Sequence, residues 1–273
     1  MLPDWQTLFA RRPLIARALC LPLARSVPPV WFASAEPADL LVMPAEMFLH
    51  AGESARASAF KFGQPRENFA LGRLAGKLAL LAAVGASVPL ASALSPRGIE
   101  GEELAQGLRS MEIGNGERGE PLVRADGPQP PPPAVSLSHV NGLGVAIAFP
   151  AGARMGLDLE LIEARRAETV RKGVPLSAEE EAWLKVTLLP EATALLLLWT
   201  AREALGKALG SGLACKWETL ALREVASGGR GFYAGRYRHQ PQFHCASWVG
   251  PGAVMSLAFP ETAEVWPAAT APP

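Results

Sequence analysis

The sequence has few cysteines and no excess of charge of either sign. Three of its 273 residues are cysteine, and they lie far apart at Cys20, Cys215 and Cys245 without a CxxC spacing. Neither a zinc site nor a disulfide framework is indicated, and a reducing cytoplasm is the expected setting. Basic and acidic residues number 26 each. A protein that binds nucleic acid through its phosphates usually carries a basic excess, so no nucleic-acid partner is expected.

The sequence also lacks a segment typical of a membrane span or a secretion signal. The longest apolar run, residues 78–94, is interrupted by Gly85 and Pro89, which makes it a poor membrane span. The N-terminus carries Arg11, Arg12 and Arg17 among apolar residues but no continuous apolar core before a cleavage site. We therefore expect an extension that lies on the domain, not a signal peptide, and no membrane partner.

Common nucleotide-binding and hydrolytic motifs are missing as well. The sequence contains no GxxxxGK[ST], HExxH or GxSxG segment, and its GxGxxG match, residues 114–119, lies in a Gly/Asn-rich turn between two expected strands rather than between a strand and a helix. The P-loop, Rossmann, zincin and α/β-hydrolase classes therefore have no motif support. Apolar residues make up 49% of the chain, which is enough for a sizeable core in one large domain or two small ones.

Hydrophobic periodicity and turn residues predict the elements of the first half. We expect helices over residues 44–62, with a break at Gly52, and 67–83. We expect strands over residues 27–32, 104–113 and 121–124, the last two joined around a Gly-Asn-Gly turn. Residues 127–133 are rich in proline, which favours a stiff loop over a ligand for a proline-reading module.

The middle of the chain has a predicted meander of three strands. We expect these strands over residues 134–139, 144–149 and 155–162, with a hairpin turn at Asn141-Gly142. Neighbouring strands lie about 5 Å apart, so this arrangement would bring His139 close to Asp158. Ser177 and Glu180 fit a capping box for a helix over residues 178–188. A long helix over 191–209 and strands across 217–259 complete the prediction.

The pattern predicts an α+β fold of two pseudo-symmetric halves, each a small, mainly antiparallel sheet packed with a long helix. We place the halves at residues 27–150 and 151–260, preceded by an extension over 1–26 and followed by a loose tail over 261–273. Gly72-Arg73 and Gly206-Lys207 each lie on a helix that is followed by strands. This similarity is a weak sign of internal duplication.

Acidic residues on two separate elements indicate chemistry at a phosphate. Asp158 and Glu160 are two apart on a strand, and Glu203 and Lys207 are four apart on a helix, so each pair shares a face. Carboxylates are the hard oxygen ligands that Mg²⁺ prefers, and an ammonium neutralises phosphate charge. The alternatives are a structural ion pair of Asp158 with Arg154 and an intrahelical pair of Glu203 with Lys207.

A second group of candidates is basic. Arg66, Arg73 and Lys77 are spaced by seven and four residues, so they could share a helical face that binds a phosphate-rich ligand, or else form a solvated face. Arg56 lies just upstream. His139 is a candidate hydrogen-bond donor to phosphate, although a lone histidine is more often structural.

These residues together resemble a known family. Gly156-Leu157-Asp158-Leu159-Glu160, followed by the segment from Trp199 to Lys207, is similar to the paired signature of 4′-phosphopantetheinyl transferases. The segments Ser136–His139 and Gly119-Glu120-Pro121, and the arginine-led segment from Arg56 to Arg73, match further motifs in the same order. Length and spacing resemble the monomeric, surfactin-synthetase-activator type.

The resemblance implies a fold, an activity and a set of site residues. The protein would bind coenzyme A and Mg²⁺ between two similar halves and transfer phosphopantetheine to a serine of an apo acyl, polyketide or peptidyl carrier protein, releasing 3′,5′-ADP. The implied metal ligands are Asp158, Glu160 and Glu203. The implied catalytic residues are Glu203, Lys207 and His139. The implied contacts to coenzyme A come from Arg56, Arg73, Gly119, Glu120, Pro121, Ser138, His139 and Lys207.

The sequence departs from the family pattern at two positions. Glu120 replaces the usual lysine, which removes a positive phosphate partner, for which Arg118 or Arg124 would have to compensate. Arg202 replaces the lysine before Glu203, so a planar fork replaces a point charge. A catalytically silent regulator that binds coenzyme A or a carrier, and a Mg²⁺-dependent phosphohydrolase, are therefore kept as alternatives. The basic run Arg165, Arg166, Arg171 and Lys172 is either a contact with an acidic carrier helix or a solvated loop.

Overall fold

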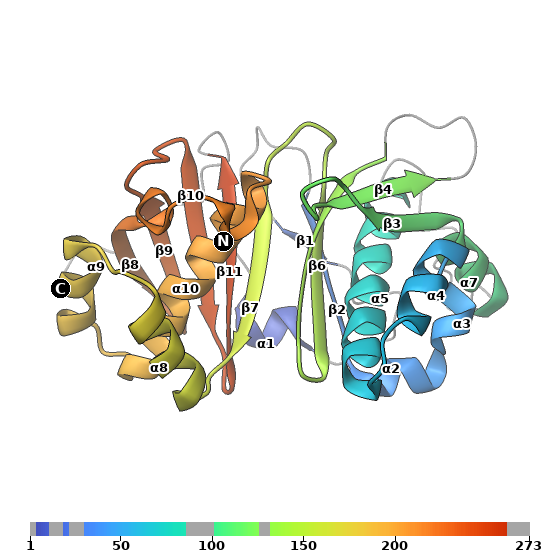
Figure 1. Cartoon of the computed structure of the whole chain (residues 1–273), viewed down its shortest axis with the longest axis horizontal. Helices are drawn as coiled ribbons and strands as arrows, with labels where there is room; N and C mark the ends of the chain where they lie inside the picture. Colours follow the sequence, from blue (N-terminus) through green and yellow to red (C-terminus); the bar gives the residue numbers. More distant parts are fainter. Residues whose placement is uncertain (1–3, 11–18, 22–29, 86–100, 126–131, 261–273) are drawn as a thin grey trace. The chain divides into compact units, whose positions relative to one another are not determined.

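The computed structural model describes residues 4–10, 19–21, 30–85, 101–125 and 132–260. Within these ranges the fold is α+β with antiparallel sheets, as expected from the sequence (Figure 1). The chain divides into two compact units at Ala153–Arg154. We call residues 30–153, with 8–10 and 19–21, the N-terminal unit, and residues 154–260, with 4–7, the C-terminal unit. The predicted proline-rich loop lies largely, and the predicted tail wholly, outside the described residues.

The N-terminal unit is a four-stranded sheet covered by one long helix. The sheet has the order β1-β2-β6-β5 and is antiparallel throughout. Its strands are β1 (Leu19–Leu21), β2 (Val30–Ala35), β5 (Ala134–Val140) and β6 (Leu143–Phe149). The helices are α2 (Pro37–Val42), α3 (Ala45–Phe48), α4 (Ala51–Ser58), α5 (Gly63–Gly85) and α7 (Gly101–Arg109). A separate hairpin joins β3 (Met111–Asn115) to β4 (Pro121–Ala125).

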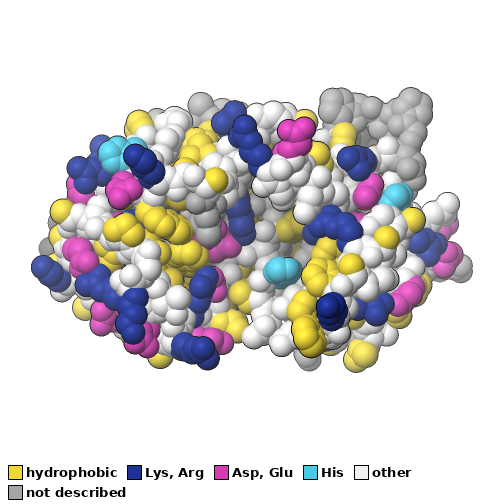
Figure 2. Space-filling model, in the orientation of Figure 1, with side chains coloured by type: hydrophobic (Ala, Val, Ile, Leu, Met, Phe, Trp, Pro, Cys, Tyr) yellow, Lys and Arg dark blue, Asp and Glu magenta, His cyan; other side chains and the backbone are white. Residues whose placement is uncertain are grey.

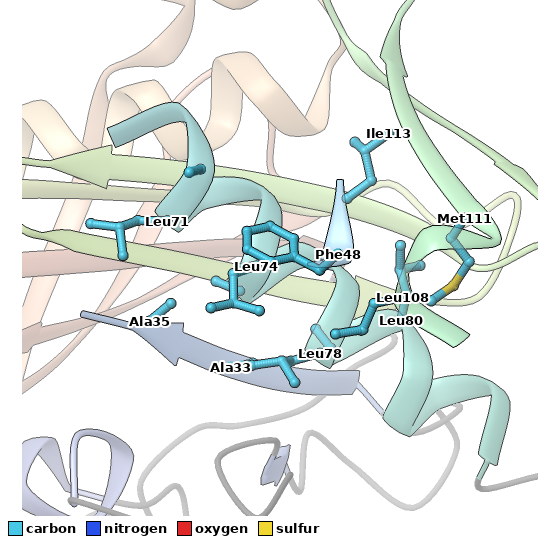
Figure 3. Packing of buried hydrophobic residues seen from close by; sticks show 14 of the residues in the cluster. Ala33, Ala35, Phe48, Leu71, Leu74, Leu78, Leu80, Leu108, Met111 and Ile113 are labelled. Atoms are coloured by element: carbon cyan, nitrogen blue, oxygen red, sulfur yellow. The ribbon is translucent and has the colours of Figure 1, made fainter. Parts of the chain in front are cut away.

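Helix α5 forms the core of this unit because its apolar residues recur at helical spacing. Leu71, Leu74 and Leu78 are buried against Ala33 and Ala35 of β2, as Figure 3 shows. Burying one such leucine contributes about 1.5–3 kcal/mol relative to leaving it exposed. The predicted helix over 67–83 is confirmed as part of α5, which begins about one turn earlier, at Gly63.

Several boundaries in this unit differ from the sequence prediction. Residues 104–113 were expected to form a strand, but most of them belong to α7, and β3 begins only at Met111. Leu104 and Leu108, four apart, are both buried, which is the spacing of a helical face. The expected strand over 27–32 is β2, shifted to later residues. Strand β1 comes from the predicted extension and pairs with β2.

The C-terminal unit is a five-stranded antiparallel sheet with the order β7-β11-β10-β9-β8. Its strands are β7 (Gly156–Leu161), β8 (Leu222–Gly229), β9 (Phe232–Tyr237), β10 (Phe243–Val249) and β11 (Ala253–Pro260). Its helices are α1 (Trp5–Leu8), α8 (Ala164–Gly173), α9 (Ala178–Val186) and α10 (Glu191–Ala208), with 3₁₀ turns η2 (Gly212–Ala214) and η3 (Trp217–Leu220). Helix α10 packs on β7 and β11.

The predicted three-strand meander is wrong in its last strand. The hairpin of β5 and β6 forms as expected, with Gly142 at a positive φ of 75° in its turn. Strand β7 does not pair with β6: it pairs with β11, a strand about 100 residues later, in the other sheet. The expectation that strand pairing brings His139 beside Asp158 is therefore withdrawn. Periodicity identifies strands but carries no information on which strand pairs with which.

Each unit contains a buried ion pair between a glutamate of a short helix and a basic residue of the long helix. Glu180, the third residue of α9, completes the predicted capping box with Ser177 and also accepts from the backbone N–H of Leu222 at 3.0 Å. Its carboxylate receives the fork of Arg202 from α10, with Nε at 3.0 Å from Oε1 and Nη2 on Oε2. Both side chains are fully buried.

In the N-terminal unit Glu53 takes the corresponding place in α4. It completes a capping box with His50 and accepts from the N–H of Ile113 at 2.9 Å. Lys77 of α5 reaches it at 2.6 Å and also donates to the carbonyls of Phe48 and Leu108. Burial lowers the pKa of Lys77, and the nearby Glu53 charge opposes that shift. The alternative of a solvated basic face on α5 is therefore wrong for Lys77.

Figure 2 shows acidic and basic side chains interspersed over the visible face, in keeping with the zero net charge. In the described part of the chain, no helix is both long enough and apolar enough to span a bilayer.

The buried pair of the C-terminal unit makes a direct prediction for stability. Arg202→Met leaves the Glu180 carboxylate buried without its cation, so we expect the free energy of unfolding to fall by about 3–5 kcal/mol. Arg238→Met breaks the exposed ion pair with Glu179, which water and salt screen, and should lower the free energy of unfolding far less. Urea denaturation of both variants measures the difference. Equal losses would contradict the role given to Arg202.

Candidate functional site

Strand β7 lies in direct backbone contact with helix α10 at Gly156. A Cβ atom at this position would overlap the carbonyl oxygen of Ala204 and the backbone N–H of Ala208, so only glycine lets β7 lie so near to α10. Side chains alternate along a strand, and therefore Asp158 and Glu160 lie on the same face of β7 as Gly156. The glycine of the sequence motif thus serves to bring both carboxylates to the helix.

Helix α10 meets this face with a stripe of residues four apart, namely Trp199, Glu203 and Lys207. Residues at this spacing lie one above another on a helix. Lys207 contacts Asp158 and Trp199 contacts Glu160, so Glu203 lies between the two contacts. We call these five residues, together with Arg166, the carboxylate cluster. All of its members belong to the C-terminal unit.

Asp158 forms an ion pair with Lys207. The Nζ atom of Lys207 donates to Oδ1 of Asp158 at 2.7 Å and to the backbone carbonyl of Leu157 at 2.9 Å. Asp158 is buried, with 6% of its surface exposed, so an ionised carboxylate here needs such a cation. Lys207, rather than Arg154, is the partner that the structure records.

Glu160 is held by three N–H donors that all reach the same oxygen. Nε and Nη2 of Arg166, from helix α8, and Nε1 of Trp199 donate to Oε1, the first and last at 3.0 Å. The guanidinium of Arg166 also lies over the Trp199 ring, 4.8 Å from its centroid. The glutamate is thus fixed from two helices at once.

Glu203 is partly buried, and its pKa is raised to about 7. Burial is the largest cause, and the neighbouring charge of Asp158 is the next. Lys207 opposes the shift, Glu160 adds to it, and Arg166 opposes it. A carboxylate with a pKa near neutrality can both accept and release a proton at physiological pH.

The cluster suits a divalent cation in the chemistry of its donors but is not preassembled as a metal site. Three carboxylates lie on the facing sides of β7 and α10, and oxygen donors of this kind are what Mg²⁺ prefers. Among the residues that the structure describes, no group of three or more His, Cys, Asp or Glu side chains is placed to hold a metal ion. Lys207 and Arg166 instead engage one oxygen each of Asp158 and Glu160.

The basic candidates of the N-terminal unit gather around one aromatic ring. The guanidinium of Arg73 lies 4.4 Å from the centroid of Phe69, and that of Arg56 lies 5.5 Å from it. Arg73 is buried, 3.6 Å from Glu53, and burial lowers its pKa to about 10. Arg66 lies apart from this group, about half exposed and 3.9 Å from Glu46. Two of the predicted arginines are therefore brought together.

Ser138 and His139 lie near the hairpin end of β5 and β6, above α5. A Cβ atom on Gly144 of β6 would overlap the backbone of Leu71 and Gly72, so the hairpin rests directly on the helix. The ring of His139 would contact a Cβ atom on Gly72 at 3.5 Å. His139 is exposed and Ser138 is buried. The structure thus places His139 beside the residue that precedes Arg73.

The Gly119-Glu120-Pro121 segment closes the hairpin between β3 and β4. Gly119 has a positive φ of 85°, and Pro121 begins β4. The Glu120 carboxylate folds back over this turn and accepts from the N–H of Arg118 at 2.9 Å. Arg124, one of the two suggested substitutes for the missing lysine, lies 3.5 Å from Glu112. Glu120 therefore stabilises its own turn.

Two residues of the cluster were not given a role from the sequence. Trp199 was quoted as part of a motif, and Arg166 was placed in a basic run expected to be a carrier contact or a solvated loop. The run lies on helix α8, and three of its members form ion pairs within the chain: Arg166 with Glu160, Arg171 with Glu181, and Lys172 with Glu168. Arg202, expected next to the site chemistry, instead points into the core.

The comparison with known proteins agrees with this location. Residues 154–258 match the model of the 4′-phosphopantetheinyl transferase superfamily. The match covers less than half of the chain but spans the whole carboxylate cluster and all five strands of its sheet, apart from the last residues of β11. No curated protein matches the sequence. The match and the α+β fold support a transferase role and phosphopantetheine transfer as the general activity.

The raised pKa of Glu203 makes stability depend on pH in a defined direction. With a pKa of 4.5 in the unfolded chain and about 7 in the fold, ionised Glu203 destabilises the folded state. This cost is absent below pH 4.5, grows from there to pH 7 and is complete above it. Glu203→Gln should therefore stabilise the protein by about 1–2 kcal/mol at pH 8, after allowance for solvent screening, and by little at pH 4.5.

Urea denaturation at both pH values, with a chelator present, measures this effect. Glu224→Gln, an exposed glutamate on β8, serves as the control and should show no comparable pH-dependent gain. A gain for Glu203→Gln that is the same at both pH values would contradict the assignment.

Proposed function

We propose that this protein transfers the 4′-phosphopantetheine group of coenzyme A to a serine hydroxyl of an apo carrier protein and releases 3′,5′-ADP in a Mg²⁺-dependent reaction. The observation that carries the proposal is the placement of Glu203 between Asp158 and Glu160, inside the segment that matches the family model. Acyl, polyketide and peptidyl carrier proteins are the proposed partners. We further propose a cytoplasmic monomer, in keeping with three cysteines that are all free.

The reaction exchanges the phosphoanhydride bond of coenzyme A for a phosphate ester bond to serine. The serine oxygen attacks the β-phosphorus of coenzyme A, the bond from that phosphorus to the bridging oxygen breaks, and 3′,5′-ADP leaves with the electron pair. Glu203 is the proposed acceptor of the serine proton, because it is a carboxylate placed between the contacts of Asp158 and Glu160 on the facing side of α10. Its pKa of about 7 is that of the cation-free cluster.

Charge on the diphosphate is the other barrier to this displacement. When bound, Mg²⁺ would neutralise that charge, and Asp158, Glu160 and Glu203 are the residues that would hold it. Lys207 adds an ammonium next to Asp158, suited to the charge that develops on the leaving phosphate.

The N-terminal unit supplies a separate set of proposed contacts. Arg56 and Arg73, gathered on Phe69, suit the 3′-phosphate of the adenosine, and His139 suits a further phosphate oxygen. The proposed contacts of Gly119 and Pro121 use the backbone of their turn, and Ser138 offers its hydroxyl. Glu120 contributes through turn geometry rather than by direct charge attraction, because its carboxylate is engaged in that turn.

Transfer itself can be measured by intact mass. We expect incubation with Mg²⁺, coenzyme A and an apo carrier domain to add one phosphopantetheine group to the carrier. A panel of fatty-acid, polyketide and peptide-synthetase carriers identifies the partner. A silent regulator would modify none of them, and a phosphohydrolase would release phosphate or phosphopantetheine without any carrier. Either result would contradict the proposed transfer.

The proposed roles of the cluster predict which side chains are needed. Glu203→Gln should lower the transfer rate by about 10²–10⁴-fold, the usual contribution of a positioned acid–base group. Asp158→Asn should lower it as well, because it removes a proposed ligand of the cation. Arg171→Gln, which breaks a partly exposed ion pair on α8, should leave the rate within twofold. Circular dichroism checks that each variant is folded. A wild-type rate in either of the first two variants would show that the chemistry lies elsewhere.

A further inference from the structure

Arg166 has no part in the transfer chemistry proposed above, yet it is the residue most closely bound to Glu160. It donates from two of its nitrogens to Oε1 and stacks on Trp199, which donates to the same oxygen. The side chain of Glu160 is only 17% exposed, whereas that of Arg166 is 36% exposed. A guanidinium that is bound by a carboxylate and also lies over an aromatic ring is more ordered than one in a simple surface ion pair.

The other ion pairs of helix α8 show what a simple surface pair looks like here. Arg171 and Glu181 are 43% and 39% exposed, and Lys172 and Glu168 are 74% and 63% exposed. Neither pair has an aromatic partner among the described residues or a carboxylate from β7. Arg166 therefore differs from its neighbours in burial and in what it contacts.

The charge balance of the carboxylate cluster indicates the role of Arg166. Its three carboxylates and two cations leave one net negative charge when Glu203 is ionised. Each carboxylate of β7 has its own cation, Lys207 for Asp158 and Arg166 for Glu160. The Arg166 guanidinium thus supplies to Glu160 the positive charge that a bound cation would otherwise supply.

We propose that Arg166 is a positioning residue that competes with a divalent cation for Glu160 and so sets the cation affinity of the cluster. The proposal rests on the proposed function for the need of a cation. In the cation-free protein the guanidinium holds Glu160 in place and offsets its repulsion of Asp158 and Glu203. A cation that binds Glu160 must then displace part of the hydrogen bonding between the Arg166 guanidinium and the carboxylate. This displacement weakens cation binding.

Calorimetric titration of Mn²⁺, used as a probe for Mg²⁺, into the full chain without coenzyme A tests this directly. Arg166→Gln removes the competing charge, so its dissociation constant should fall about three- to tenfold below that of the wild type. The matched control Arg171→Gln, from the same helix, should stay within twofold of the wild type. Thermal shifts by Mn²⁺ should follow the same order, larger for Arg166→Gln than for the other two proteins.

A second variant keeps the test decisive where Arg166→Gln folds poorly. Arg166→Lys retains the charge but loses the fork and the stacking, so its Mn²⁺ affinity should lie between those of the wild type and Arg166→Gln. Affinity in Arg166→Gln equal to or weaker than that of the Arg171→Gln control would overturn the proposal, as would a wild type that binds no Mn²⁺. Carrier modification by the wild type in the same preparations shows whether the proposed function survives such a result.

Discussion

The close packing of β7 on α10 at Gly156 is the constraint on which the candidate site depends. A side chain at this position would push the strand away from the helix, since it would meet the backbone at Ala204 and Ala208. Asp158 and Glu160 follow at two-residue intervals, so both reach the helix stripe of Trp199, Glu203 and Lys207 only because the strand begins in direct backbone contact. The geometry of the site thus depends on position 156 having no side chain.

The two buried ion pairs give each unit the same internal support. In each unit a glutamate at the third position of a short helix closes a capping box, binds a backbone N–H of a later strand and receives a cation from the long helix. Buried pairs of this kind contribute little net stability but penalise any arrangement that separates them. This repetition is a firmer sign of duplication than the Gly-Arg and Gly-Lys pairs of the sequence. It also explains Arg202, whose planar fork suits both oxygens of Glu180.

The sequence predicts the parts of the fold that depend on local pattern. The helix over 67–83, the capping box at Ser177 and the hairpin at Asn141-Gly142 follow from periodicity and turn chemistry, which act within a few residues. The pairing of β7 with β11 could not be predicted in this way, because it depends on contacts about 100 residues apart. The motif spacing predicted Asp158, Glu160, Glu203 and Lys207 of the carboxylate cluster. It did not predict Arg166, because a charged residue on a helix gives no sign of the distant carboxylate that it will reach.

Under the proposed function, the local charge of the carboxylate cluster accounts for the binding of a diphosphate by a protein with zero net charge. Over the whole chain acidic and basic residues balance, so attraction of an anionic substrate must come from local arrangement. Three carboxylates and two cations leave the cluster with one net negative charge when Glu203 is ionised. Burial is the largest cause of the raised pKa of Glu203, and the neighbouring charge of Asp158 is the next. With a divalent cation bound, the same cluster would carry one net positive charge. Under the proposed function, the anionic substrate would then be attracted only to the cation-loaded protein, so that anion binding would depend on cation binding.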